Sequence, residues 1–269
     1  MTQVDSVANA DDFSYPAFPE LVPDRVIDRD RYRVRFASNT TDLDQILKLR
    51  FEVFNLELGE GLDSSFETRR DEDEYDRRCH HLLVQDQRNG DIVGTYRLQT
   101  LEMAAAGAGF YSAGEYDLSY FPAEILRESI ETGRACIRRD HRNRQVLFLL
   151  WKGLATYLES TGRRYLFGCC SLTSQDPNEG WSLYRQLVAE DRVREDFEVP
   201  VLEDLRCDPN GAAPEEPVHL PTLFRTYLRY GAKVCSPPAL DREFKTIDYL
   251  VLFDAATISD KTRKLFFEP

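Results

Sequence analysis

The chain lacks features that would place it in a membrane or on nucleic acid. No apolar run approaches the roughly 20 residues needed to span a bilayer, and the acidic, polar N-terminus does not look like a secretory signal. Basic residues are fewer than acidic ones: the chain has 34 Lys and Arg and 47 Asp and Glu, for a net charge of −13. This balance argues against nonspecific binding to nucleic acid or to anionic lipid surfaces. We therefore expect a cytoplasmic protein with no nucleic-acid partner, while peripheral contact with the inner face of the membrane, through residues 264–267, stays open.

The six cysteines show neither CxxC pairs nor the Cys/His spacing typical of metal ligands. They stand at positions 79, 136, 169, 170, 207 and 235. This pattern is typical of reduced, mostly buried thiols in a cytoplasmic protein, so we expect no metal site. It also offers no obvious Cys/His pair for nucleophilic catalysis.

Length and composition fit a globular protein with one large domain. The chain has 269 residues, of which 42% are hydrophobic and 30% charged. Residues 1–30 lack periodicity and are interpreted as a tail or irregular segment. We expect the main domain over 31–255 and a C-terminal tail over 256–269.

Hydrophobic periodicity predicts an α/β domain built around a mixed sheet flanked by helices. The expected strands cover 33–37, 81–84, 92–98, 130–137, 165–170, 232–235 and 247–253. The expected helices cover 40–58, 145–160, 177–190 and 220–230. Asn89-Gly90 predicts a hairpin turn, and Asp176-Pro177 predicts a helix start. Residues 62–78 are expected to form a charged loop, and 102–129 a long connection with a short helical piece.

The most informative segment runs from Glu131 to Arg142, where an apolar strand passes into a cationic turn just before a helix. Helix N-terminal N–H groups and nearby arginines can converge there on one phosphate. In a chain of net charge −13, this cluster would attract an anionic ligand or a small acidic protein. The alternative interpretation is a solvated, charged turn. The arginines concerned are Arg134, Arg138, Arg139, Arg142 and Arg144.

Glu131 is an acid on an otherwise apolar strand, where an unpartnered carboxylate is costly. We interpret it as the general base for an ammonium that must lose a proton before attack. A salt bridge with Arg134 or Arg97 is the structural alternative. In an ideal strand Glu131 and Arg134 point to opposite faces. A bulge at Gly133 would bring both into one cleft and free an N–H for an oxyanion.

Four stretches resemble motifs of the Gcn5-related N-acyltransferase fold, in the branch that uses long-chain acyl thioesters of acyl-carrier protein. They are LRFEVF at 49–54, EDEYD at 72–76, VGTYRL at 93–98 and ETGR at 131–134. The second of them is also similar to a loop of acyl-homoserine-lactone synthases.

Further stretches resemble the ornithine N-acyltransferases, which are often labelled hemolysin-like. They are CHHLLV at 79–84, GFYSA at 109–113, LFGCCSL at 166–172 and YLRYGA at 227–232. The likeness runs from about residue 32 to 255. It implies a Gcn5-related mixed sheet flanked by helices, with an extended C-terminal half, so that 31–255 is an acyltransferase domain.

The resemblance implies a transferase that moves a long, 3-hydroxylated fatty acyl group from acyl-carrier protein to the amine of ornithine, giving lyso-ornithine lipid. The amine would attack the thioester directly, without a covalent acyl-enzyme. Enzymatic alternatives are an N-acyl amino acid synthase with another acceptor and an acyl-homoserine-lactone-type synthase, which needs S-adenosylmethionine. A non-enzymatic lipid-binding or hemolysin-like protein is disfavoured, because the chain has no spanning segment and no cationic amphipathic stretch.

The resemblance also implies roles for single residues. Glu131 and Arg134 are expected to be catalytic, together with Asp73 and Asp76, which would bind the cationic acceptor. The alternative for the two aspartates is a solvated charged loop. The residues expected at the substrate are Arg50, Arg97, Phe54 and His81. Arg97 would grip the acceptor's carboxylate in a bidentate way, whereas the structural alternative pairs the arginines with the acids.

The stretch 142–146 contains no glycine, unlike the pyrophosphate loops of acetyl-CoA enzymes. This disfavours a tightly held nucleotide and suits the single phosphate of a phosphopantetheine arm, with arginines contacting the carrier protein. No tightly bound cofactor is expected, and acyl-phosphopantetheine on acyl-carrier protein would act as the co-substrate. The residues expected to hold it are Arg138, Arg139, Arg142 and Arg144.

Apolar residues near the predicted splay of the sheet are candidates for the acyl pocket. Phe167, Cys169 and Leu172 lie closest to it by analogy with the fold. Tyr184 on the following helix is a candidate for protonating the leaving thiolate. Side chains of the helix after residue 144 are interpreted as core rather than as an acyl tunnel, namely Leu147, Phe148, Leu150, Leu154 and Leu158.

Overall fold

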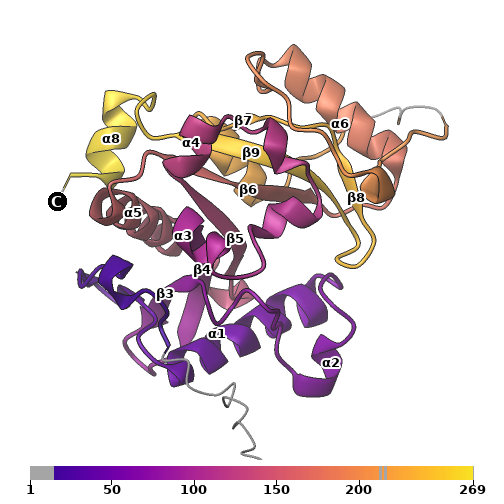
Figure 1. The fold of residues 1–269 in the computed structure, drawn as a ribbon. Helices are drawn as coiled ribbons and strands as arrows, with labels where there is room; N and C mark the ends of the chain where they lie inside the picture. Colours follow the sequence, from indigo (N-terminus) through magenta and orange to yellow (C-terminus); the bar gives the residue numbers. More distant parts are fainter. Residues whose placement is uncertain (1–14, 212–213, 215–216, 269) are drawn as a thin grey trace, which may run out of the picture.

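The computed structural model describes residues 15–211, 214 and 217–268, which fold around one nine-stranded sheet (Figure 1). The strand order is β1-β2-β3-β4-β5-β6-β9-β7, with β8 paired to β9. β5 and β6 run parallel, and the other paired strands run antiparallel. The strands are β1 Ile27–Arg29, β2 Tyr32–Phe36, β3 His80–Asp86, β4 Ile92–Thr100, β5 Ser129–Ile137, β6 Tyr165–Leu172, β7 Lys233–Val234, β8 Ala239–Asp241 and β9 Thr246–Asp254.

Helices connect and cover these strands. They are α1 Thr40–Phe51, α2 Ser65–Thr68, α3 Leu101–Ala105, α4 Ala123–Arg127, α5 Arg144–Thr161, α6 Pro177–Ala189, α7 Thr222–Arg229 and α8 Asp260–Phe266. Short 3₁₀ turns occupy Pro19–Leu21, Tyr111–Gly114, Leu118–Tyr120, Arg139–His141 and Glu203–Leu205. The helix predicted over 40–58 is α-helical only to Phe51 and continues as a π-helix over Glu52–Glu57. π-Helical turns are rare and are found frequently at functional sites.

Local capping explains where the longer helices begin and end. Asn39 caps α1 and Asn143 caps α5, each accepting backbone N–H groups of the first turn. Asp176 caps α6, with Pro177 at the first helical position, as predicted. α5 ends at Gly162, whose φ of 62° is a left-handed conformation that glycine adopts without strain.

Helices cover both faces of the central sheet. Leu82 and Val84 of β3 belong to the apolar cluster that includes α5, whereas Leu83 between them packs with residues of α1. The alternation follows from the two-residue period of a strand. A strand covered on both faces needs apolar side chains throughout, which explains why 82–84 is a continuous apolar run.

The predicted C-terminal tail over 256–269 is wrong for half of that segment. Asp260–Phe266 forms α8, which lies beside α5 (Figure 1). Phe266 is 3% exposed and stacks on Trp151, with ring centroids 5.6 Å apart. One of the two rings in the predicted membrane-contact segment is therefore part of the core, while Leu265 is exposed. Within the described part of the chain, no helix combines the length and apolarity needed to cross a membrane.

The predicted N-terminal tail is also ordered where the structure describes it. Residues 1–14 lie outside the described residues. After them, Ala17 is buried and Ile27–Arg29 forms β1 against β2. β8, Ala239–Asp241, is a second strand that the periodicity did not predict. Both strands are only three residues long, too short to show a hydrophobic period.

The sheet opens between β5 and β6, as expected. These strands pair over three residues and separate after Glu131 and Phe167. At the point of separation, a Cβ on Gly168 would lie 2.1 Å from the carbonyl oxygen of Thr132. Glycine is therefore required there, because any side chain would push the two strands apart.

β5 carries a bulge beside this opening. Two of its residues, Arg134 and Ala135, oppose the single residue Tyr96 of β4. Arg134 has a left-handed φ of 48°, which is uncommon for a residue other than glycine. The bulge predicted at Gly133 thus exists one residue further along. It allows Glu131 and Arg134 to line the same cavity.

Candidate active site

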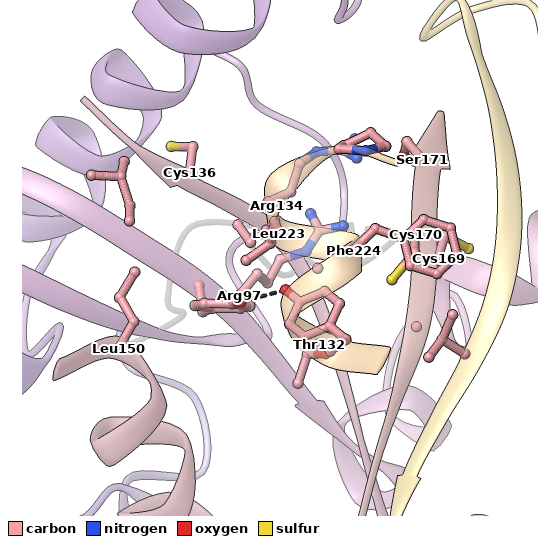
Figure 2. Close-up of a pocket in the computed structure, with 18 of the residues that line it drawn as sticks. Arg97, Thr132, Arg134, Cys136, Leu150, Cys169, Cys170, Ser171, Leu223 and Phe224 are labelled. Atoms are coloured by element: carbon pink, nitrogen blue, oxygen red, sulfur yellow. Dashed lines mark hydrogen bonds between the residues drawn. The ribbon is translucent and has the colours of Figure 1, made fainter. Parts of the chain in front are cut away.

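A cavity of about 720 Å³ occupies the opening between β5 and β6. Its volume lies in the range of roughly 300–1,000 Å³ typical of small-molecule sites. Figure 2 shows Arg97 and Arg134 between the strand that carries Cys136 and the strand that carries residues 169–171. Polar and charged side chains therefore meet in the splay of the sheet, next to an apolar wall.

The apolar wall comes largely from α5 and α7. Leu150 and Leu154 belong to the hydrophobic core and also line the cavity. The interpretation of the α5 side chains as core is thus confirmed for Leu150, Leu154 and Leu158, which are buried. Leu147 and Phe148 are only partly buried, and Leu147 lines the cavity as well. Phe167 and Cys169 line it too, whereas Phe148, Leu158 and Leu172 do not.

Glu131 faces the cavity from β5 and is 5% exposed. Its Oε2 accepts the N–H of Tyr111, and its Oε1 accepts the N–H of Ser112, both at 2.8 Å. The Ser112 hydroxyl also donates to Oε1. Burial raises the pKa of Glu131, although these three hydrogen bonds favour the charged form. A carboxylate of raised pKa in a cavity is suited to accepting a proton from a substrate.

Asp73 joins two arginines at the edge of the cavity. Arg97 Nη1 donates to both carboxylate oxygens of Asp73 at 2.6 Å, and Arg134 Nη2 donates to Oδ2 at 3.1 Å. Burial opposes ionisation of Asp73, but the charges of Arg97 and Arg134 hold its pKa below the usual value. Arg134 also lies over two aromatic rings, 4.8 Å from the centroid of Tyr111 and 4.1 Å from that of Phe244. These contacts hold both guanidinium groups in fixed positions.

Three predicted site residues lie behind this layer rather than in the cavity. Arg50, Asp76 and His81 are each fully buried, and none of them lines the cavity. Arg50 Nη1 donates to Asp76 Oδ1 at 2.6 Å, and Nε donates to Asp71 at 2.6 Å. The direct substrate contact expected of these residues is therefore corrected to a supporting position. Their carboxylates and cations are already paired with each other.

His81 illustrates this supporting position. Its Nε2 lies 3.3 Å from Asp76 Oδ1, and its Nδ1 lies 2.8 Å from the hydroxyl of Tyr15. Burial lowers the pKa of His81 in spite of the neighbouring carboxylate, so the neutral ring is favoured at neutral pH. Phe54, in contrast, lines the cavity from the π-helix, as predicted for a substrate-binding residue.

The arginines predicted to hold the carrier arm fall into two groups. Arg142 and Arg144 line the cavity, and Arg142 pairs with Glu57 at 2.6 Å. Arg138 and Arg139 do not line it, and Arg138 pairs with Asp91 and Asp140. The Asn143 side chain already accepts two N–H groups at the start of α5. The two N–H groups that Asn143 caps are therefore already occupied, and the rim carries the side chains of Arg144 and of Arg142, which is paired with Glu57.

Tyr184 does not fit the role considered for it. It lies outside the cavity lining, and its hydroxyl donates to Glu198 at 3.2 Å. This position corrects the prediction that it protonates the leaving thiolate.

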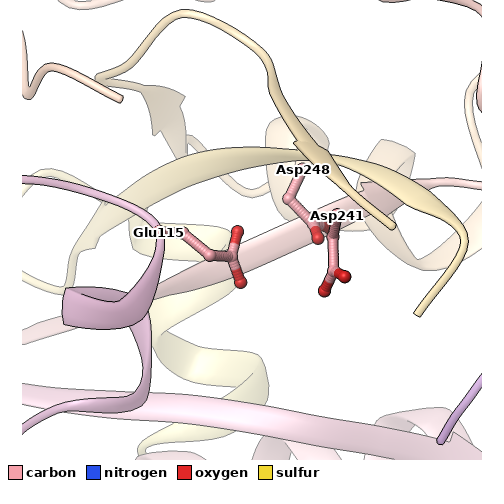
Figure 3. Close-up of side chains that lie close together, drawn as sticks. All are labelled: Glu115, Asp241 and Asp248. Carbon is pink, nitrogen blue, oxygen red and sulfur yellow. The ribbon is translucent and has the colours of Figure 1, made fainter. Parts of the chain in front are cut away.

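Three buried carboxylates at the cavity were not predicted. Glu115, Asp241 and Asp248 place one oxygen each within 4.8 Å of one another (Figure 3). Among the described residues, this is the one grouping of three such side chains that could hold a metal ion. Asp241 and Asp248 line the cavity. The signal that sequence reasoning could have used is Asp248, which interrupts the apolar strand 247–253.

We expect Asp248→Asn to stabilise the protein at neutral pH. Burial, with a smaller effect of Asp241, raises the pKa of Asp248 to about 6. Wild-type stability should fall as pH rises from about 4 to 6, by up to about 3 kcal/mol, because the unfolded chain releases this proton first. Asp248→Asn has no proton to release and should not show this pH-dependent loss of stability. Its amide oxygen can still accept a hydrogen bond from the hydroxyl of Thr246. Urea denaturation at pH 4 and pH 7.5 measures the difference.

A matched control is Asp28→Asn, whose carboxylate pairs with Arg33 at the surface. The Arg33 hydrogen bond lowers the pKa of Asp28, so this change should give no gain at neutral pH. Equal stability of Asp248→Asn and wild type at pH 7.5 would contradict the prediction.

Comparison with known proteins places the site in a family. Residues 49–152 match the acetyltransferase (GNAT) domain family, a range that includes the predicted catalytic, substrate-binding and carrier-binding residues but not the candidates after residue 152. Similar solved structures include the acyl-homoserine-lactone synthase LasI, with 13% identity, a TM-score of 0.46, and coverage of 88% of this chain and 94% of that chain. A putative N-acetyltransferase from Lactobacillus plantarum has 14% identity, a TM-score of 0.46, and coverage of 83% and 98%.

Curated relatives are similar over nearly the whole length. The L-ornithine N(alpha)-acyltransferase of Brucella abortus is 30% identical over 244 residues, which is 85% of this chain and 86% of that protein. The L-ornithine N(alpha)-acyltransferase of Rhizobium meliloti is 31% identical over 244 residues, which is 84% of this chain and 81% of that protein. The chain therefore belongs to the family of the L-ornithine N(alpha)-acyltransferases, as its motifs indicated.

Proposed function

We propose that the chain transfers a long, 3-hydroxylated fatty acyl group from acyl-carrier protein to the α-amine of ornithine, giving lyso-ornithine lipid. The observation that carries this proposal is the cavity between β5 and β6, where an apolar wall meets a cluster of carboxylates and arginines. An acyl chain suits the first part, and a charged amino acid suits the second. The names of the curated relatives support the acceptor.

Glu131 is the residue best placed to take the proton that the acceptor must lose. The α-ammonium gives a proton to Glu131, directly or through a water, and the amine nitrogen then attacks the thioester carbonyl carbon. The C–N bond forms, the tetrahedral oxyanion collapses, and the C–S bond breaks. The phosphopantetheine thiolate leaves and takes up, directly or through water, the second proton that the nitrogen loses, while Glu131 releases its own proton to solvent. Arg97 and Arg134 line the same cavity and supply positive charge for the acceptor's carboxylate.

The donor's carrier protein would dock at the rim that holds Arg142 and Arg144. Both side chains line the cavity next to the start of α5, with Arg138 and Arg139 in the preceding turn. A net charge of −13 repels an acidic partner elsewhere, so this local cationic surface selects the docking site. We place the reaction in the cytoplasm, from which the acylated product would partition into the membrane.

Direct attack, without an acyl-enzyme, is part of the proposal. Cys136 and Cys169 line the cavity, but burial raises the pKa of Cys136 to about 12 and that of Cys169 well above its usual value. Neither thiol is therefore activated as a nucleophile. Cys136→Ala and Cys169→Ala should keep kcat within about threefold of wild type. Loss of turnover in a folded variant, or an acyl adduct in the intact mass of wild type, would contradict direct attack.

The test of the function is lipid mass spectrometry of bacteria that express the chain, beside a Glu131→Gln control. The expected result is an ion with the mass of a 3-hydroxyacyl ornithine that the control lacks. A new N-acyl derivative of another amino acid would keep the reaction and replace the acceptor. Purified enzyme with acyl-carrier-protein and CoA thioesters then distinguishes the donors. Absence of transfer from every thioester to ornithine would overturn the proposal.

A further inference from the structure

Glu115, Asp241 and Asp248 form a group of three buried carboxylates, which we call the acidic triad. Their side chains are 5%, 8% and 3% exposed. Neither oxygen of Glu115 and only one oxygen of Asp248 has a hydrogen-bond partner among the described residues. Figure 3 shows the carboxylate of Glu115 pointing toward the two aspartates, which come from β8 and β9.

The acidic triad differs from the other buried acids of the site. Asp71, Asp73 and Asp76 each form ion pairs with arginines. No ion pair within the described residues involves the acidic triad. Burial raises the pKa of Glu115 well above its usual value, and the negative charges of Asp248 and Asp241 add to the rise. The positive charge of Arg134 offsets this rise only in part, and no paired cation within the described residues stabilises the charged form.

Two members of the acidic triad line the same cavity as the proposed base, and the third, Glu115, lies behind them with one oxygen within 4.8 Å of theirs. Asp241, Asp248 and Glu131 all line it. Cys169 lines the cavity as well, and burial first, then the charges of Glu115, Asp248 and Glu131, raise the pKa of its thiol. A small molecule in the cavity can therefore reach Glu131 with one group and the acidic triad with another.

We propose that the acidic triad binds the side-chain ammonium of a dibasic amino-acid acceptor and thereby selects an acceptor that carries a second amine. This inference rests on the proposed function, because it requires an amino acid in the cavity. It assigns opposite tasks to two groups of carboxylates. Glu131 takes a proton from the reacting amine, whereas the acidic triad keeps the other amine charged.

The charge of each site determines which of the acceptor's two amines binds at Glu131 and which binds at the acidic triad. Three carboxylates around an ammonium raise its pKa and prevent it from becoming a nucleophile. The reacting amine must instead lose its proton, which suits the single carboxylate of Glu131. The acidic triad therefore fits the amine that does not react.

The three oxygens of the acidic triad match the three N–H donors of an ammonium, whereas Mg²⁺ requires six oxygen ligands. An ammonium has three N–H donors, and hydrogen bonds of about 2.8 Å along tetrahedral directions place three acceptor oxygens about 4.6 Å apart. One oxygen of each member lies within 4.8 Å of the other two, so the acidic triad can supply three acceptors at this spacing. Mg²⁺ requires six oxygens at about 2.1 Å, so that neighbouring oxygens lie about 3 Å apart. Asp241 Oδ1 is moreover already held by the N–H groups of Glu243 and Phe244.

The test compares ornithine with 2-aminopentanoic acid, which has the same carbon chain without the second amine. In Glu115→Gln, kcat/KM for ornithine should fall roughly 100-fold, mainly through KM, because a charged hydrogen-bond partner is lost. The value for 2-aminopentanoic acid should change by less than about threefold. The matched control is Glu60→Gln, another carboxylate that lines the cavity, and it should leave the preference between the acceptors unchanged.

Each other outcome overturns the assignment. An equal loss with both acceptors would mean that Glu115 supports the fold or the reaction in general. Loss of wild-type activity in EDTA, with calorimetric binding of Mg²⁺ that Glu115→Gln abolishes, would make the acidic triad a metal site. Thermal unfolding shows whether the variant is folded, and relief of the carboxylate repulsion should raise its Tm.

A binding measurement separates this inference from the proposed function. If wild type acylates neither acceptor, the proposed function fails, but calorimetry of the free enzyme still tests the acidic triad. Ornithine should then bind wild type and not Glu115→Gln, while 2-aminopentanoic acid should bind neither of them tightly. Equal binding of ornithine to both proteins would overturn the assignment.

Discussion

Replacement of Glu131 by Gln is expected to lower kcat by about 10²–10⁴-fold, the usual contribution of a general base. KM for the acceptor should change little, because the amide keeps the shape of the side chain. Burial raises the pKa of Glu131, so the wild-type rate should rise with pH as this carboxyl deprotonates, with a midpoint above that of a free glutamate. The variant should lose this rise. Steady-state kinetics between pH 5 and 8 measure both effects.

A control must separate chemistry from the hydrogen bonds that Glu131 makes. Ser112→Ala removes only the hydroxyl donor and leaves the carboxylate, and it should lower kcat by less than about tenfold. In Glu131→Gln, the amide N–H₂ cannot accept from a backbone donor, so Tm must be compared as well. Activity of folded Glu131→Gln within threefold of wild type would exclude Glu131 as the base.

Arg50→Met is expected to lower the free energy of unfolding by about 3–5 kcal/mol, because it leaves two carboxylates buried without their shared cation. Arg50 is fully buried, and its guanidinium donates to Asp71 and Asp76. Burial alone would raise the pKa of Asp76, but Arg50 and Arg97 hold it well below the usual value. The stabilising contribution is therefore present at neutral pH and lost as pH falls through this low pKa. Urea denaturation at pH 7 measures it.

Arg33→Met is the matched control for this prediction. It breaks the surface pair with Asp28 and should cost less than about 1 kcal/mol. A similarly small decrease in the free energy of unfolding of Arg50→Met would contradict the view that its buried ion pairs with Asp71 and Asp76 stabilise the protein. Because Asp76 Oδ2 accepts the N–H of Asp73 at 2.9 Å, we also expect the acceptor's KM to rise in Arg50→Met.

The longer elements could be predicted because their signals are local. The helix predicted over 145–160 is α5, Arg144–Thr161, and the helix predicted over 177–190 is α6, Pro177–Ala189. Apolar period and capping residues define both within a few positions. α8 was missed for the opposite reason. It is short, and its stability depends on packing of Phe266 against Trp151, which is 115 residues away in the sequence.

The candidate site was predicted in part. The motifs indicated Glu131, Arg134, Arg97 and Asp73, which the structure brings to one cavity or its edge. The sequence did not indicate that Arg50, Asp76 and His81 lie one layer deeper. How deeply a side chain is buried depends on how its helix, loop or strand packs against the other elements. The sequence motif around the residue does not contain this information.

The sequence by itself determined the class of the fold, the extent of most helices and strands, and the family through its motifs. It also placed an acid and a cationic turn at the strand that forms one side of the opening. Only the tertiary structure decided which charges are paired and which are not. Glu115 lies on a connecting segment, and Asp241 and Asp248 lie on β8 and β9, so their carboxylates meet only after the C-terminal strands join the sheet. Long-range packing of this kind leaves no period or spacing in the chain, so the meeting of the three carboxylates could not be predicted, although Asp248 stands out in its apolar strand.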